Sequence, residues 1–149
     1  MLKKLFLQKG WAGKTITRLE TIDRINPLIR QHIVLNRSYD DAEKNISNRE
    51  FASKIVDLQK KARMNVGKLV EIVFSSGGVA YSGTDIEPSS VHVGEGDDRI
   101  VETLAGLEGE LLDAVRAESK IEHHMRTRAV LQTVERDAAD RLKALSDEK

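Results

Sequence analysis

The sequence predicts an all-α protein: an antiparallel four-helix bundle with one long crossover between its second and third helices. Apolar residues recur at helical spacing in four stretches of the chain. Aromatic residues make up only 4% of the 149 residues and there are two prolines, which favours long helices over a many-turned β protein. Residues 77–96 contain five glycines and no sustained period, as expected of a long connection.

Composition excludes several classes of protein. No run approaches the ~18 apolar residues that span a bilayer, so we expect no membrane association. The chain has no cysteine, which excludes disulfides, thiolate metal sites and cysteine nucleophiles. The basic residues 1–14 contain an apolar stretch that is too short for a secretory signal. We therefore predict an N-terminal arm over residues 1–14 and a cytoplasmic four-helix domain over residues 15–149.

The first two helices are predicted over residues 15–44 and 48–76. Pro27 lies inside the first stretch, so we expect either a kink or a helix that begins at Pro27. Ser47 and Glu50 have the spacing of a capping box for the second helix. The expected core positions are Ile16, Leu19, Ile22, Ile25, Ile29, Ile33 and Tyr39 in the first helix, and Phe51, Ile55, Leu58, Ala62, Val66, Leu69, Val70 and Val73 in the second.

The double glycine Gly77-Gly78 is a typical helix end, and it opens the predicted crossover over residues 77–96. Twenty extended residues reach ~60 Å, whereas a helix of ~24 residues is ~36 Å long. The crossover is therefore long enough to pass along the whole bundle. Two helical hairpins joined in this way have the connectivity of ferritin-like bundles.

The third and fourth helices are predicted over residues 97–121 and 126–146, with Asp97-Asp98 as the cap of the third. No glycine or proline interrupts residues 110–146, so one continuous helix is the alternative. We favour a break near residues 121–128, because it gives two helices that match the first pair in length. Their expected core positions are Ile100, Leu104, Leu107, Leu111 and Val115, then Val130, Val134, Ala138, Leu142 and Leu145.

The segment KLVEIVFSSGGVAYSGTD, residues 68–85, resembles the end of the second helix in the ferritin-like superfamily, particularly in small bacterial four-helix proteins related to rubrerythrin. The helix order agrees with that family over residues 15–146. In its metal-binding members, two helices each supply one Glu and the other two each supply a Glu-x-x-His pair, because positions i and i+3 share a helix face. The resemblance implies a di-iron centre in the core.

This chain departs from that ligand pattern. Counted from the double glycine, the pair on the second helix falls near Ala62 and Asn65, within ARMN. The last helix, with VERDAADRL, retains Glu135 but has Ala138 at the histidine position. A shift by one turn finds no Glu-x-x-His elsewhere in the chain. We therefore expect that a typical di-iron centre is lost.

Three residues could still form a residual iron site on this resemblance: His32, near the glutamate position of the first helix, Glu118 and Glu135. For His32, which falls on the predicted inner stripe, a hydrogen-bonded core imidazole is the favoured interpretation. The leading expectation is no cofactor, with iron at these three residues as the alternative.

The stretch ESKIEHHM, residues 118–125, contains the adjacent histidines His123 and His124. Neighbouring residues on a helix point ~100° apart, so the two imidazoles cannot bind one ion together. We expect both on an exposed polar turn, and we expect Tyr39 with Asp40 and Asp41 at the solvated end of the first helix. No serine lies at motif spacing from a base, so the sequence predicts no catalytic residues and no enzyme.

Charge divides the chain into two halves. Residues 1–76 contain 15 Lys and Arg against 8 Asp and Glu, and residues 77–149 contain 9 against 16. The favoured interpretation is that a basic hairpin packs on an acidic one. Nucleic acid is the less favoured partner, because no recognised motif supplies groups that read or stack on bases.

Three functions remain open from the sequence. The leading hypothesis is a non-enzymatic bundle that acts through self-association, as a homodimer, or through a protein partner. It depends on the absence of the di-iron ligands and on apolar residues outside the stripe that faces the core, which could form a second interface. These residues are Val34, Leu35, Val56, Leu112 and Leu131. The alternatives are a degenerate iron-binding protein and a nucleic-acid-associated or scaffold protein that uses the basic half.

Overall fold

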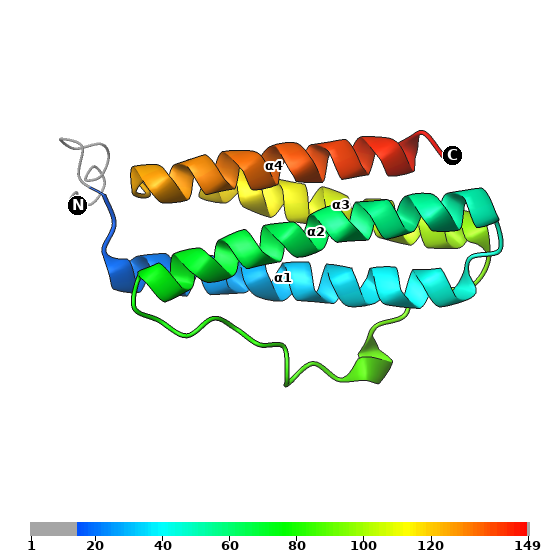
Figure 1. The fold of residues 1–149 in the computed structure, drawn as a ribbon, viewed down its shortest axis with the longest axis horizontal. Helices are drawn as coiled ribbons and strands as arrows, with labels where there is room; N and C mark the ends of the chain where they lie inside the picture. The colour runs from blue at the N-terminus through cyan, green and yellow to red at the C-terminus, as the bar shows by residue number, and fades with distance from the viewer. Residues whose placement is uncertain (1–14, 149) are drawn as a thin grey trace.

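The computed structural model describes residues 15–148, which form an antiparallel bundle of four helices (Figure 1). The helices are α1 (Arg18–Asn45), α2 (Arg49–Ser75), α3 (Asp97–Glu118) and α4 (Met125–Ser146), with a short 3₁₀ turn, η2 (Pro88–Ser90), before α3. α1 packs against α2 and α3, and α4 packs against α3 and α2. The predicted fold is confirmed, and the predicted arm, residues 1–14, lies outside the described residues.

α1 begins at a capping box that the sequence analysis did not single out. The amide of Glu20 donates to Thr17 Oγ1 at 3.1 Å, and the amide of Thr17 donates to Glu20 Oε1 at 2.9 Å. The helix then continues through Pro27, so the alternative of a start at Pro27 is wrong. Ile25 and Ile29 on either side of the proline are fully buried, and this packing offsets the missing backbone hydrogen bond.

α2 begins within the predicted turn, at Asn48, but the predicted capping box of Ser47 and Glu50 does not form. Asn48, and not Ser47, is the N-cap, and its Oδ1 accepts from the amide of Phe51 at 2.9 Å. Asp97, at the start of α3, accepts from the amides of Ser47 and Asn48 at 2.8 and 2.9 Å. The expectation that Asp97 caps its own helix is therefore wrong, because its carboxylate closes the turn between α1 and α2.

The end of α2 agrees with the prediction from the double glycine. Gly77 has a φ of +88°, its amide donates to Phe74 O at 3.0 Å, and the amide of Gly78 donates to Val73 O at 3.0 Å. A Cβ at Gly78 would lie 2.6 Å from Ile22 Cδ1 on α1. The first glycine thus allows the left-handed turn, and the second allows the chain to pass close to α1.

The crossover, residues 77–96, returns along the bundle beside α1 (Figure 1). Three polar side chains of α1 hold it by hydrogen bonds to its backbone: Asn26 to Val79 and Tyr81, Arg37 to Gly83 and Ile86, and Asp41 to Val93. Asp41, which was predicted to be solvated, therefore has a structural role. The same carboxylate lies 3.2 Å from the ring of His92.

The predicted break between the last two helices is confirmed, because α3 ends at Glu118 and α4 begins at Met125. The amide of Ile16, just before α1, donates to Glu122 O at 3.0 Å and ties this turn to the start of the bundle. No described helix is long and apolar enough to cross a membrane.

We predict opposite effects for the same substitution at two glycines. Gly77→Ala should lower the free energy of unfolding by about 1–2 kcal/mol, because an alanine in the left-handed region is strained. Gly106→Ala, inside α3 with nothing within 4 Å of the added Cβ, should raise it by about 0.5–1 kcal/mol. Urea unfolding followed by circular dichroism measures both. Equal effects of the two substitutions would contradict the left-handed helix end.

Candidate functional site

Three helices place a polar residue on the stripe that faces the core. Each polar residue is three residues away from one core position and four residues away from another on the same helix. Residues at this spacing share one helix face, so the polar side chain points into the core. The residues are Asn65 between Ala62 and Leu69, Glu108 between Leu104 and Leu111, and Arg141 between Ala138 and Leu145, and all three are buried.

These residues form one hydrogen-bonded cluster, which we call the central network. Arg141 Nε donates to Glu108 Oε2 at 2.7 Å, and Arg141 Nη1 donates to Asn65 Oδ1 at 2.9 Å. Asn65 Nδ2 donates to Asp137 Oδ2 at 2.9 Å, and the hydroxyl of Tyr39 donates to Glu108 Oε2 at 2.6 Å. The central network therefore joins all four helices through side chains alone.

The centre of the network is an ion pair without access to solvent. Moving two charges out of water costs free energy, which their attraction and further hydrogen bonds must offset. Burial, and then the negative charge of Glu108, raise the pKa of Tyr39, so the phenol stays protonated and acts as a donor. Asp137 lies at the outer end of the network, where its Oδ1 is 4.0 Å from Lys61 Nζ.

His32 lies beside the central network on α1 and is fully buried. Its Nδ1 is 2.8 Å from Leu28 O, so Nδ1 carries the proton and donates. Burial lowers the pKa of His32 to about 4, the hydrogen bond to Leu28 opposes this change, and the charge of Arg141 adds to it. The ring is therefore neutral at pH 7, and the prediction of a hydrogen-bonded core imidazole is confirmed.

Three polar atoms around this point have no hydrogen-bond partner among the described residues: His32 Nε2, Glu108 Oε1 and Arg141 Nη2. They include a lone pair, a carboxylate oxygen and a cationic donor, so the core retains unused hydrogen-bonding capacity of both signs. Each such group has a free-energy cost of about 1–3 kcal/mol when it is buried without a partner. Apolar side chains could fill this part of the core without that cost, so packing alone does not explain why polar groups lie here.

The predicted metal ligands His32, Glu118 and Glu135 have separate partners. Glu118 Oε2 lies 2.6 Å from Nε2 of His123, and Glu135 Oε2 lies 3.3 Å from Nε of Arg116 near the surface. In the part of the chain that the structure describes, no group of three or more His, Asp or Glu side chains could hold a metal ion. The structure thus does not bring the three residues together as one cluster.

Two predictions of exposure are wrong. His123 is only 1% exposed, whereas His124 is exposed as expected. Because the break after α3 removes His123 from the helix, the turn directs its ring back to Glu118, five residues earlier. Tyr39, which falls on the predicted apolar stripe of the first helix but was also expected at its solvated end, is fully buried, because the stripe continues to Ala42 in the core.

Glu108, Arg141 and Asp137 were not among the residues predicted from the sequence. The available signal was a charged residue of opposite sign within each of the two apolar seams, Glu108 in α3 and Arg141 in α4. The predicted core positions Leu107 and Leu142 are only partly buried, so each seam is rotated by about one residue toward its charged member. Two opposite charges on facing seams indicate a buried ion pair.

The fold and the central network together define the class of protein: a four-helix bundle with a buried ionic core. Neither the known protein families nor the curated protein sequences include a match to this chain. The resemblance to the ferritin-like superfamily therefore stays a prediction.

We predict strong coupling between the two charges of the core. Arg141→Met or Glu108→Leu alone should lower the free energy of unfolding by about 3–5 kcal/mol, because each leaves an unpaired buried charge. The double variant should lose clearly less than the sum of the two changes. Urea denaturation of the four proteins gives the coupling free energy.

The exposed pair of Arg116 and Glu135 provides the matched control for this cycle. Arg116→Met should change the free energy of unfolding by less than about 1 kcal/mol, because solvent screens that pair. Additive losses at Glu108 and Arg141 would mean that the two side chains do not act as one pair.

We also predict that His32 makes stability depend on pH. The pKa of His32 is about 4 in the folded state, below its ordinary value of 6.5, so the unfolded chain takes up a proton first as the pH falls. The contribution of His32 is complete above about pH 6.5 and decreases toward pH 4. Between pH 7 and pH 5, the free energy of unfolding should fall by about 2 kcal/mol more in the wild type than in His32→Gln.

The measurement is urea denaturation of both proteins at both pH values. The wild type and His32→Gln have the same carboxylates, so the contribution of these groups to the pH dependence cancels in the comparison. His124→Gln removes an exposed imidazole and is the control, and it should show the pH dependence of the wild type. An unchanged pH dependence in His32→Gln would contradict a neutral, buried imidazole.

Proposed function

We propose that this protein is a non-enzymatic helical bundle that acts by self-association, as a homodimer formed through one end of the bundle. The observation that best supports the proposal is a group of large apolar side chains that are 68–86% exposed: Leu19, Phe74, Val79 and Met125. We call this group the apolar end. Exposed apolar surface marks an interaction site where it gathers into one patch, and these four side chains lie on segments that meet at one end of the bundle.

The members of the apolar end come from four parts of the chain that meet in space. They lie at the start of α1, in the last turn of α2, at the start of the crossover and at the start of α4 (Figure 1). The side chain of Asn26 on α1 donates to Val79 O, which holds the crossover beside the start of α1. The remaining exposed large apolar side chains among the described residues are Val56 and Met64, farther along α2.

The apolar end replaces the second seam expected from the sequence. Leu35, Leu112 and Leu131, which were proposed for an outer interface, are buried within the bundle itself. These three leucines are therefore not available to a partner, and of the five expected positions only Val56 is exposed while Val34 is partly buried. Burial of one large apolar side chain against a second copy would contribute about 1.5–3 kcal/mol.

Symmetry and charge favour a second copy as the partner. A two-fold axis through the apolar end would place each exposed side chain against the same surface of the other chain, so one patch is used twice. The chain has a formal net charge of zero at pH 7, and two copies therefore have no net charge repulsion to overcome.

The central network supports an interaction role over iron chemistry. The guanidinium of Arg141 lies in the core and its charge reaches His32, one of the predicted iron ligands. A metal cation at His32 would experience repulsion from this fixed positive charge. Glu118 and Glu135 are each within 4 Å of other cationic or imidazole groups, which would have to be displaced first.

We predict that association weakens when the apolar end is charged. The weight-average mass of the wild type should rise from one chain toward two with increasing concentration. In Phe74→Glu, the concentration at the midpoint should increase at least tenfold, because an exposed aromatic anchor is lost and a charge is buried. Sedimentation velocity over a dilution series measures this shift.

Met64→Glu is the matched control, since Met64 is also exposed on α2 but lies outside the apolar end. It should associate like the wild type. A wild-type mass that stays at one chain over the whole concentration range would refute the homodimer, and equal weakening by both variants would refute the assigned surface.

A further inference from the structure

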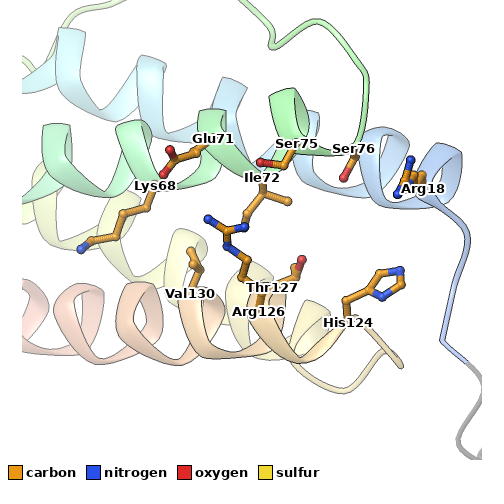
Figure 2. Close-up of a pocket in the computed structure, with 10 residues that line it drawn as sticks. All are labelled: Arg18, Lys68, Glu71, Ile72, Ser75, Ser76, His124, Arg126, Thr127 and Val130. Atoms are coloured by element: carbon orange, nitrogen blue, oxygen red, sulfur yellow. The ribbon is translucent and has the colours of Figure 1, made fainter.

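A cavity of about 320 Å³ opens between three elements at the same end of the bundle (Figure 2). The start of α1, the last two turns of α2 and the first two turns of α4 line it. Ile72 and Val130 form an apolar base. We propose that this cavity binds a small organic phosphate, a phosphate monoester with a compact apolar or sugar-like body.

Positive charge dominates the lining of the cavity. Arg18, Lys68, Arg126 and His124 line it from α1, α2 and α4, whereas Glu71 is the single acidic residue of the lining. Within residues 15–148, none of the four basic side chains is within 4.0 Å of a carboxylate. In Figure 2 the guanidinium of Arg126 extends from α4 toward Ile72. The two arginines and the lysine are therefore free to pair with an anionic ligand.

The start of α4 lies beside the cavity, and its backbone amides carry partial positive charge like the basic side chains. His124 is the N-cap and makes no side-chain cap, and the first turn of this 22-residue helix contains no acidic residue. The first helical amides, at Met125, Arg126 and Thr127, precede the first backbone bond of the helix, from the amide of Arg128 to His124 O. Such amides and the helix dipole favour an anion.

Thr127 adds a hydroxyl group to the lining of the cavity. It is only 5% exposed, yet its side chain lines the cavity and has no hydrogen-bond partner among the described residues. Figure 2 shows its hydroxyl directed from α4 toward α2, where Ser75 and Ser76 supply two more hydroxyls. The hydroxyl faces the cavity, where a ligand oxygen can accept a hydrogen bond from it.

The donor set and the size of the cavity together define the ligand class. The lining offers cationic side chains and hydroxyls beside the start of α4, and these groups suit the several acceptor oxygens and the double negative charge of a phosphate monoester. A volume of about 320 Å³ is at the lower end of the range for small-molecule sites, which is larger than a lone phosphate requires. The phosphate would contact Arg18, Arg126 and Thr127, and the organic part would pack on Ile72 and Val130.

The test is isothermal titration calorimetry of the full chain with phenyl phosphate, beside inorganic phosphate, at a protein concentration at which the mass is constant. We expect one site per chain and tighter binding of phenyl phosphate than of inorganic phosphate. Arg126→Gln should weaken binding of phenyl phosphate at least tenfold, because a charge-assisted contact is lost. Arg136→Gln changes an exposed arginine of α4 outside the cavity and should leave the affinity unchanged.

Glu71→Gln guards against loss of binding through misfolding, because it should tighten binding of phenyl phosphate severalfold by removing the only acid of the lining. Absence of binding by the folded wild type, or equal affinity in Arg126→Gln, would overturn the proposal. So would binding only to phosphatidic acid vesicles and not to phenyl phosphate. Phe74→Ser removes the exposed ring of the apolar end without adding a charge beside the cavity, and it should keep its affinity for phenyl phosphate, so the phosphate site and the homodimer can fail separately.

Discussion

The buried ion pair between Glu108 and Arg141 is the constraint on which the rest of the structure depends. An unpaired charge in the core is far more costly than a shifted apolar contact, so only registers that join α3 and α4 at these residues are stable. Asn65 on α2 and Tyr39 on α1 form hydrogen bonds with this ion pair, so the positions of these two helices are constrained as well. Leucines alone would tolerate sliding of one helix along another, whereas these directional hydrogen bonds specify one alignment of all four helices.

α1 makes polar contacts on two sides, and the contacts on its outer side hold the crossover, residues 77–96, against the bundle. Its core side contributes Tyr39 and His32 to the interior, and its outer side binds the crossover through Asn26, Arg37 and Asp41. The crossover thus replaces solvent along one face of α1. A twenty-residue segment whose only regular structure is the short turn η2 can be ordered in this way, because its backbone groups find side-chain partners.

The proposed interactions concentrate where several chain segments end together. The start of α1, the end of α2 and the start of α4 bring helix-terminal amides, basic side chains and exposed apolar side chains to one end of the bundle. The ends of helices can supply such groups because the last turn of a helix contributes less to the packed core than its middle. The interior, by contrast, contains the ion pair of Glu108 and Arg141 and its hydrogen-bonded neighbours.

The sequence alone determined the helical stretches, the crossover and the stop at Gly77, because hydrophobic period and backbone chemistry are local properties. The break before α4 has no glycine or proline to mark it, and the sequence favoured it only because it gives helices of matching length. Only the tertiary structure decided which polar groups meet. Asp97 closes a turn fifty residues away, His123 folds back onto Glu118, and Arg141 pairs with Glu108 rather than with solvent. These contacts depend on the rotation and register of packed helices, and a period of 3.6 residues indicates the inward face without specifying the partner across it.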